Sequence, residues 1–169
     1  VFIFTNAMPA LGGALGWDWL ANISWFGTPS MATVTIIVVS IWQNIGFLMI
    51  IYTAGLQTIP KDVMESAELD GCSGLKKVLK IELPLLMPTV TINLFVSISG
   101  AFKSFDIPNA MTGGGPYGST MPVAMNIYQE AFTKYNLGYG SAKSEILFLT
   151  VAAVTLIQLY CTRKKEVEY

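Results

Sequence analysis

Side chains that perform catalysis or bind metals are scarce in this chain of 169 residues, which has no histidine and only two cysteines. Without histidine, neither a histidine-dependent catalytic triad nor the usual ligand set of a transition metal can be built. The sequence also lacks the Gly-x-x-x-x-Gly-Lys-Ser/Thr loop that holds nucleotide phosphates. We therefore expect no catalytic residue, no metal site and no cofactor, and any ATP hydrolysis would take place on another chain.

Amides, hydroxyls and small residues inside two long apolar runs are the candidate binding groups. Gln43 and Asn44 lie near the middle of the first run, close to Phe47. In the second run, small and partly polar residues at i, i+3, i+4 and i+7 would share one helix face: Ser97, Gly100, Ala101 and Ser104. Because an amide in hydrocarbon is costly unless it is paired, such groups either join helices or line a watered cavity. The residues alone leave both interpretations open.

A polar segment between the two apolar runs contains residues that typically begin and end helices, and it predicts two short helices. Pro60 suits the first turn of a helix, because that turn has N–H groups to spare. Gly71 can end this helix in the left-handed conformation, and Ser73 can cap a second one. The segment is thus predicted to form a short knob that protrudes from a membrane toward a soluble partner.

Membrane-spanning helices must position these residues. The chain is 53% hydrophobic and 12% charged, against about a quarter charged in an average soluble domain. Three apolar stretches, at about residues 32–54, 83–102 and 142–161, are long enough to cross about 30 Å of hydrocarbon. The second of these is expected to begin at Pro84. The opening residues resemble the end of a further span, so we expect the C-terminal portion of a longer protein.

Basic residues predict the orientation, because lysine and arginine favour the cytoplasmic side of short loops. Four lysines fall in the loop at about residues 58–82, and Arg163, Lys164 and Lys165 follow the last span. The knob and the C-terminus are therefore expected in the cytoplasm, and loops at about 6–31 and 103–141 outside. Glycines, prolines and asparagines in the first external loop should break any long helix there, leaving a short interfacial one.

The knob segment resembles a motif of the membrane-spanning subunits of ABC importers. In that family the loop reads Glu-Ala-Ala, two residues, Asp-Gly-Ala, then an isoleucine shortly before Leu-Pro, and it forms coupling helices that seat in a cleft of the ATPase subunit. The matching residues here are Glu65, Ser66, Ala67, Asp70, Gly71, Cys72, Ile81, Leu83 and Pro84. Two alanines of the pattern are replaced, by Ser66 and Cys72, and both replacements are small enough for a helix that sits close in a cleft.

The turn Thr112-Gly113-Gly114-Gly115-Pro116 resembles the carbohydrate branch of that family, of the maltose-importer type. In those subunits the sugar contacts two helices near the midplane of the bilayer. Matching the chain through the knob and this turn implies substrate contacts at Gln43, Asn44, Phe47, Ser97, Gly100, Ala101 and Ser104. The resemblance implies an all-α membrane protein, a polytopic transmembrane helix bundle of the type I ABC importer kind, with residues 1–169 forming part of one permease domain and a cytoplasmic coupling-helix loop.

The implied protein is the permease subunit of an ATP-driven sugar importer in a bacterial inner membrane. Its implied partners are two ATPase subunits, a second related permease subunit, an extracytoplasmic solute-binding protein, a sugar or oligosaccharide, and the lipid bilayer. Because no lysine or arginine lies in the middle of a span, a neutral sugar fits better than a strongly anionic substrate. A net charge of −1 without a clustered basic and aromatic surface gives no sign of nucleic-acid binding.

A secondary transporter and a channel subunit are the alternative functions. A secondary transporter usually carries an intramembrane carboxylate for its coupling ion, and the spans have no central aspartate or glutamate. A channel would use the glycine-rich turn as a ring of carbonyls, which requires a symmetric assembly and gives the knob no role.

Overall fold

The computed structural model describes residues 1–163, and these residues form helices joined by turns, with no strand among them. The all-α fold expected from the sequence is confirmed for this part of the chain. Lys164 and Lys165, two of the basic residues that predict a cytoplasmic C-terminus, lie outside the described residues.

The chain divides into two compact units. The first comprises Val1–Gln43 with Phe102–Glu145, and the second comprises Asn44–Ala101 with Ile146–Tyr169. The knob and most of the expected substrate residues belong to the second unit, whereas Gln43, Ser104 and the glycine turn belong to the first.

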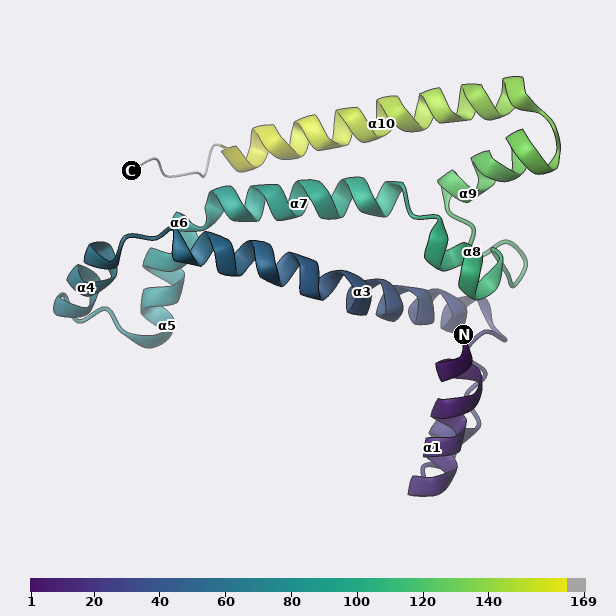
Figure 1. Ribbon diagram of the computed structural model, residues 1–169, viewed down its shortest axis with the longest axis horizontal. Coiled ribbons are helices and arrows are strands. Elements are labelled where there is room, and N and C mark those ends of the chain that lie inside the picture. Colours follow the sequence, from purple (N-terminus) through teal and green to yellow (C-terminus); the bar gives the residue numbers. More distant parts are fainter. Residues whose placement is uncertain (164–169) are drawn as a thin grey trace. The chain divides into compact units, whose positions relative to one another are not determined.

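Two of the described helices are long and apolar enough to cross a membrane, α3 (Pro29–Gln57) and α10 (Leu137–Arg163) (Figure 1). They have 29 and 27 residues, which corresponds to roughly 40 Å each at 1.5 Å per residue. The apolar runs expected at about 32–54 and 142–161 lie inside these two helices, and each helix extends beyond its run at both ends.

The second apolar run is not one straight span. Residues 83–102 contain α6 (Leu83–Leu85) and α7 (Met87–Phe102), and η2 (Val78–Glu82) precedes them. The helical stretches Gly74–Leu85 and Met87–Phe102 are bent by 70° relative to each other. Pro88 explains the bend, because proline has no N–H to donate and its ring clashes with the carbonyl four residues earlier, that of Pro84. The sequence predicts that the span begins at Pro84, which lies in α6, whereas the long helix after the bend begins at Met87. Together the two bent helical stretches are long and apolar enough to form one broken span.

The knob consists of α4 (Lys61–Leu69) and α5 (Gly74–Lys77). Pro60 precedes α4 as its N-cap, one residue earlier than a first-turn position. Ser73 precedes α5 with an extended backbone, as expected of an N-cap, but its side chain makes no capping hydrogen bond. The sequence therefore predicted both helix starts to within a residue, but not the bonding at the second.

The first unit contains the N-terminal helices η1 (Ile3–Ala7), α1 (Met8–Leu15) and α2 (Asp18–Ala21). Residues 3–15 form one continuous apolar helical stretch, which ends at Gly16 with a left-handed φ of +69°. The sequence predicts a short helix inside this loop, and α1 is such a helix, although the helical stretch also includes Asn6, Pro9 and two glycines that were expected to break a longer one. A single proline is tolerated near the start of α1, where the helix can adjust.

The same unit carries the short helices that follow α7, namely α8 (Asp106–Thr112), α9 (Val123–Tyr128) and η3 (Gln129–Thr133); α8 and α9 are labelled in Figure 1. Gly140 in the first turns of α10 packs on Ala131 of η3, since a Cβ built on Gly140 would lie 2.8 Å from the Ala131 Cβ. This close approach fixes the turn between η3 and α10.

Candidate functional site

The two helices that carry most of the expected substrate residues are in direct contact within the second unit. A Cβ built on Gly55 of α3 would lie 2.9 Å from the Thr89 Cβ of α7. Farther along the pair, Asn93 Nδ2 donates a hydrogen bond to the Leu48 carbonyl, at 3.4 Å. These two contacts pair decreasing numbers on α3 with increasing numbers on α7, so the helices are antiparallel and their register is set (Figure 1).

This register indicates which side chains share the interface. On α3, Asn44 lies four residues before Leu48 and eleven before Gly55, so the three share a face. On α7, Asn93 shares a face with Ser97 and Gly100 by the same periodicity. Continuing the register from the two observed contacts brings Asn44 level with the turn from Ser97 to Gly100.

The helix pair is closely packed at one end and open at the other. Thr89 blocks any side chain at Gly55, whereas a Cβ built on Gly100 meets no atom within 4 Å. Ser97, Gly100 and Ala101 are all solvent-accessible in this chain. The segment that the sequence associates with substrate therefore has room beside it.

Two of the expected substrate residues do not fit the shared faces. Ser104 lies beyond the end of α7 at Phe102, so the expectation that it continues the helical face of Ser97 and Gly100 is wrong, whereas its contact with substrate stays a prediction. Gln43 is one residue from Asn44 and therefore about 100° away around the helix, on a side away from Leu48. Phe47 lies on α3 beside the shared face and is exposed.

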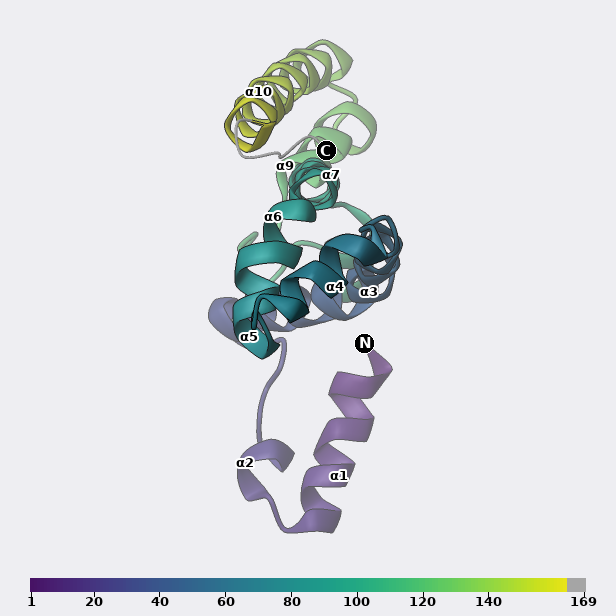
Figure 2. The same cartoon turned by 90° about the vertical axis from the view of Figure 1, so that its left-hand side faces the viewer.

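Asn93 and Gln158 make polar contacts between helices that the sequence did not predict. Asn93 is only 3% exposed, and its Oδ1 is buried without a hydrogen-bond partner among the described residues. Gln158 of α10 donates from Nε2 to the Thr91 carbonyl of α7, at 3.4 Å. Amides therefore connect α7 to α3 and to α10, and Figure 2 shows α7 between these two helices. In the sequence, the i, i+4 spacing of Asn93 and Ser97 was the available sign that Asn93 shares the face of the expected substrate residues.

The knob is organised around the end of α4. Gly71 adopts the left-handed conformation with φ +72°, as the sequence predicted. The Cys72 N–H donates to the Ala67 carbonyl at 2.9 Å, and the Gly71 N–H donates to the Glu68 carbonyl at 3.0 Å. This pair of bonds is the Schellman arrangement, which satisfies carbonyls that a helix end would leave unbonded.

This cap assigns separate roles to the residues of the motif. Ala67 and Cys72 are buried and are joined by the backbone bond that closes the cap, so their small size suits the cap. Glu65, Ser66 and Asp70 are exposed and remain available to a partner. Among the last three motif residues, which lie in η2 and α6, Leu83 is exposed, whereas Ile81 and Pro84 are half-buried.

An ion pair joins the two helices of the knob. Lys77 Nζ of α5 donates to Glu68 Oε1 of α4 at 2.6 Å. The hydrogen bond from Lys77, followed by its positive charge, holds the pKa of Glu68 below its ordinary value of 4.5. Because Glu68 is largely exposed, this pair orients the helices more than it stabilises them.

The glycine turn is bonded within itself. Gly113 and Gly114 have left-handed φ values of +59° and +89°, which glycine adopts freely. Thr120 Oγ1 donates to the Gly115 carbonyl at 2.6 Å, and the Gly115 N–H donates to the Thr112 carbonyl at 3.0 Å. Carbonyls that already accept bonds inside the turn are poorly placed to replace the hydration shell of an ion, which argues against a channel filter.

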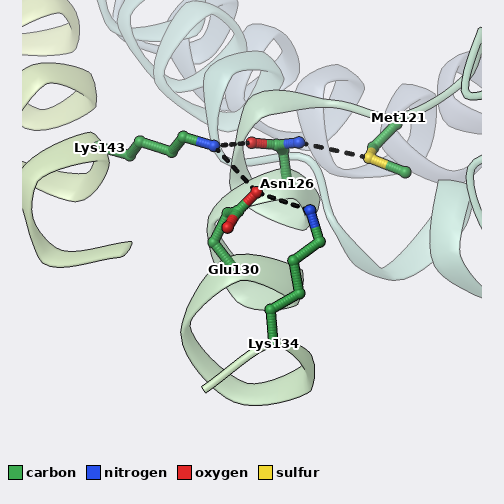
Figure 3. A network of polar contacts seen from close by, with 5 residues as sticks. All are labelled: Met121, Asn126, Glu130, Lys134 and Lys143. Carbon is green, nitrogen blue, oxygen red and sulfur yellow. Dashed lines mark hydrogen bonds and ion pairs between the residues drawn. The ribbon is translucent and has the colours of Figure 1, made fainter. Parts of the chain in front are cut away.

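A buried ionic network holds η3 against the start of α10 (Figure 3). Glu130 is 8% exposed, and its Oε1 lies 2.8 Å from Lys134 Nζ and 3.5 Å from Lys143 Nζ. Lys143 Nζ also donates to Asn126 Oδ1 at 2.7 Å, and Asn126 Nδ2 points to the Met121 sulfur.

The lysines determine the ionisation of Glu130. The hydrogen bond from Lys134 is the largest influence, and together with the charges of both lysines it outweighs burial and holds the pKa of Glu130 below its ordinary value of 4.5. The sequence alone did not indicate this network. The i, i+4 spacing of Glu130 and Lys134 was the one local signal.

Comparison with known proteins places these features in context. The sequence profile of the family described as "Binding-protein-dependent transport system inner membrane component" matches residues 1–165. The chain is 35% identical over 167 residues to a probable starch degradation products transport system permease protein of Thermoanaerobacterium thermosulfurigenes, covering 99% of this chain and 56% of the relative.

Two further relatives are similar. A sulfoquinovosyl glycerol transport system permease protein of Agrobacterium fabrum is 39% identical over 145 residues, covering 86% of this chain and 47% of that protein. A multiple sugar-binding transport system permease protein of Streptococcus mutans is 33% identical over 165 residues, covering 98% of this chain and 57% of that protein. The chain thus spans about half the length of these curated relatives, and the resemblance drawn from the knob and the glycine turn is confirmed.

Proposed function

Because the chain belongs to the family of inner membrane components of binding-protein-dependent transport systems, we propose that it forms part of the substrate path in an ATP-driven sugar importer. The observation that carries this proposal is that one uninterrupted segment of the chain joins the knob to α7. A capped knob leads through a 70° bend directly into α7, the helix whose other end is open beside Gly100.

The knob would dock on an ATPase subunit through its exposed residues Glu65, Ser66 and Asp70. The Schellman cap and the ion pair between Glu68 and Lys77 make the two short helices one body, which can transmit a displacement without unfolding. Closure of the ATPase subunits would then move the knob and, through the bend, rotate or shift α7. Two ATPase subunits, a second related permease subunit and an extracytoplasmic solute-binding protein complete the proposed importer.

The substrate contacts would lie where α3 and α7 separate. Asn44 offers both donor and acceptor groups, Ser97 offers a hydroxyl, and Phe47 offers a ring that can lie against a sugar. Gln43, Ala101 and Ser104, which the family resemblance also implies, complete the set of proposed contacts. A ligand bound here is released only if the two conformations of the path differ in affinity for it.

A neutral carbohydrate is the substrate class that these helices favour. Neither α3 nor α7 contains a lysine or arginine, and an anion held between them would lack a compensating charge. Two relatives are named for starch products and for multiple sugars, and a third is named for a sulfonated glycoside. Uptake of a neutral and a sulfonated glycoside by one reconstituted complex would separate these two classes.

Replacement of Gly71 tests the coupling role. Gly71→Val should uncouple ATP hydrolysis from transport, because a β-branched residue in the left-handed conformation costs about 1–2 kcal/mol or more and would open the cap of α4. Gly71→Asn is the matched control, since asparagine tolerates this conformation. Sugar uptake per ATP hydrolysed by the reconstituted full-length complex is the measurement.

The expected result is normal ATPase activity with reduced uptake for Gly71→Val and near-normal coupling for Gly71→Asn. A Gly71→Val complex that transports at the normal rate would refute the coupling role. Failure of a tagged full-length permease to co-purify with any ATPase would instead favour a secondary transporter or a channel.

Replacement of Asn44 and Gly100 tests the substrate contacts. Asn44→Ala should weaken uptake by roughly two- to tenfold for each hydrogen bond lost, which corresponds to about 0.5–1.5 kcal/mol per bond. Gly100→Leu should weaken it further by filling the open space. Gly46→Leu is the matched control, because a Cβ at Gly46 also meets no atom within 4 Å and lies on the opposite side of α3 from Asn44.

The Asn44→Ala and Gly100→Leu complexes should keep their basal ATPase activity and assemble normally. Unchanged sugar uptake in Asn44→Ala and Gly100→Leu would mean that this face serves helix packing and that the substrate binds to the partner permease. Equal losses in Gly46→Leu and Gly100→Leu would also contradict the proposed site.

A further inference from the structure

A groove of about 370 Å³ lies between α7 and α10 in the second unit. Its lining residues are Pro88, Thr91, Ile92, Phe95, Leu159 and Arg163. The Thr91 hydroxyl is already bonded, since it donates to the Met87 carbonyl at 3.0 Å. Apart from the Arg163 guanidinium, the groove therefore presents apolar surface.

Arg163 is the charged residue among those that line this groove. It is the last residue of α10 and is exposed, and two lysines follow it in the sequence. Within residues 1–163, the ion pairs formed by carboxylates involve Lys77, Lys134 and Lys143, and none involves Arg163. A planar guanidinium in this position is suited to bidentate binding of a phosphate group.

We propose that this groove is a binding site for an anionic phospholipid of the cytoplasmic leaflet. The phosphate group would bind Arg163, and an acyl chain would lie along Ile92, Phe95 and Leu159. Two features favour this occupant. The walls offer no hydrogen-bond partner, which an acyl chain does not need but an extended peptide would. Basic pockets between membrane helices on the cytoplasmic side are also the usual sites for anionic headgroups.

The location gives such a lipid a connection to the coupling segment. Pro88 lines the groove and also lies immediately after the 70° bend that joins the knob to α7. A lipid seated here would touch the first turn of the helix that the knob moves. The proposal rests on the cytoplasmic placement of the knob and of the end of α10, which the proposed function shares.

Photo-crosslinking identifies the occupant directly. The photoreactive residue benzoyl-phenylalanine is placed at Phe95 in the full-length permease, which is assembled with its partners in vesicles containing equal amounts of phosphatidylglycerol and phosphatidylethanolamine. After illumination, mass spectrometry of the permease measures the ratio of the two lipid adducts. The matched control has the same residue at Phe148, which is exposed on α10 and does not line the groove.

At Phe95 we expect phosphatidylglycerol adducts to exceed phosphatidylethanolamine adducts about fivefold, equivalent to about 1 kcal/mol for one basic residue at an anionic headgroup. Arg163→Gln should return the ratio to about one, and Arg163→Lys should retain most of the preference because it keeps the charge. At Phe148 the ratio should stay near one in all variants.

Three results would overturn the proposal. An adduct between Phe95 and a peptide would mean that protein covers the groove, either another part of the permease or a partner subunit. A ratio near one at Phe95 in the unmodified sequence would mean that lipid there is not selected by charge, and an absence of adducts would mean that the groove is closed. The ratio can be measured on the full-length permease alone, so a failure to bind ATPase subunits would contradict the proposed function without deciding the lipid site.

Discussion

The contact between Gly55 and Thr89 gives a sharp test of how α3 and α7 pack. Gly55→Ala adds one carbon atom at a point where the Thr89 Cβ is only 2.9 Å away, about 1 Å less than the ordinary separation of about 3.5–4.0 Å between carbon atoms. Thr89 is β-branched and stiff at its Cβ, so it cannot simply turn aside. The helices must separate at this end.

The expected cost is the difference between two opposing effects. Overpacking of this kind costs about 1–3 kcal/mol, whereas replacing glycine by alanine inside a helix stabilises by about 0.5–1 kcal/mol. Separation would also lengthen the bond from Asn93 Nδ2 to the Leu48 carbonyl, which at 3.4 Å is already long. The net expectation is a destabilisation of about 0.5–2 kcal/mol, or more if that bond is lost.

The thermal midpoint of the full-length permease in detergent, followed by fluorescence, measures this change. A loss of about 1 kcal/mol lowers the midpoint by about 2–4 °C in a domain of this size. Gly46→Ala, on the same helix but facing open space, should leave the midpoint unchanged or raise it. Thr89→Ala combined with Gly55→Ala should recover part of the loss, because it removes the two nearest side-chain atoms.

The reasoning fails if Gly55→Ala stabilises the permease as much as Gly46→Ala does. It also fails if the two substitutions at Gly55 and Thr89 are additive, because residues in direct contact should show a coupling energy of about 0.5–3 kcal/mol. Either result would mean that α3 and α7 are not closely packed at this point.

Topology and pH dependence provide two further predictions. Ser119 is exposed in the loop that the basic residues predict to lie outside. A cysteine there should react with an impermeant maleimide in intact spheroplasts, whereas one at exposed Ser66 should react only after permeabilisation; the reverse pattern would invert the orientation. Because the pKa of Glu130 is lowered in the folded state, its ion pairs should stabilise the fold fully above about pH 4.5 and lose that effect as the pH falls through the lowered value. Glu130→Gln should therefore lower the thermal midpoint at pH 7 and converge with the unmodified protein in acid; a constant difference across this range would contradict the role of the charge.

Local sequence patterns alone determined several features of this protein. The apolar runs predicted where the two long helices lie, because the bilayer requires a minimum length of apolar chain. Gly71 predicted the end of α4, since few residues other than glycine adopt its φ of +72°. The same segment and the glycine turn also predicted the family. Each of these signals acts within a few residues of the chain.

Other features depended on contacts between residues far apart in the sequence. Asn93 reaches Leu48 across 45 positions, and Lys143 reaches Asn126 across 17. Helical periodicity predicts which residues share a face, but it does not specify which neighbour that face meets. Only the tertiary structure decides this, because the register between helices is set by close approaches such as that of Gly55 and Thr89.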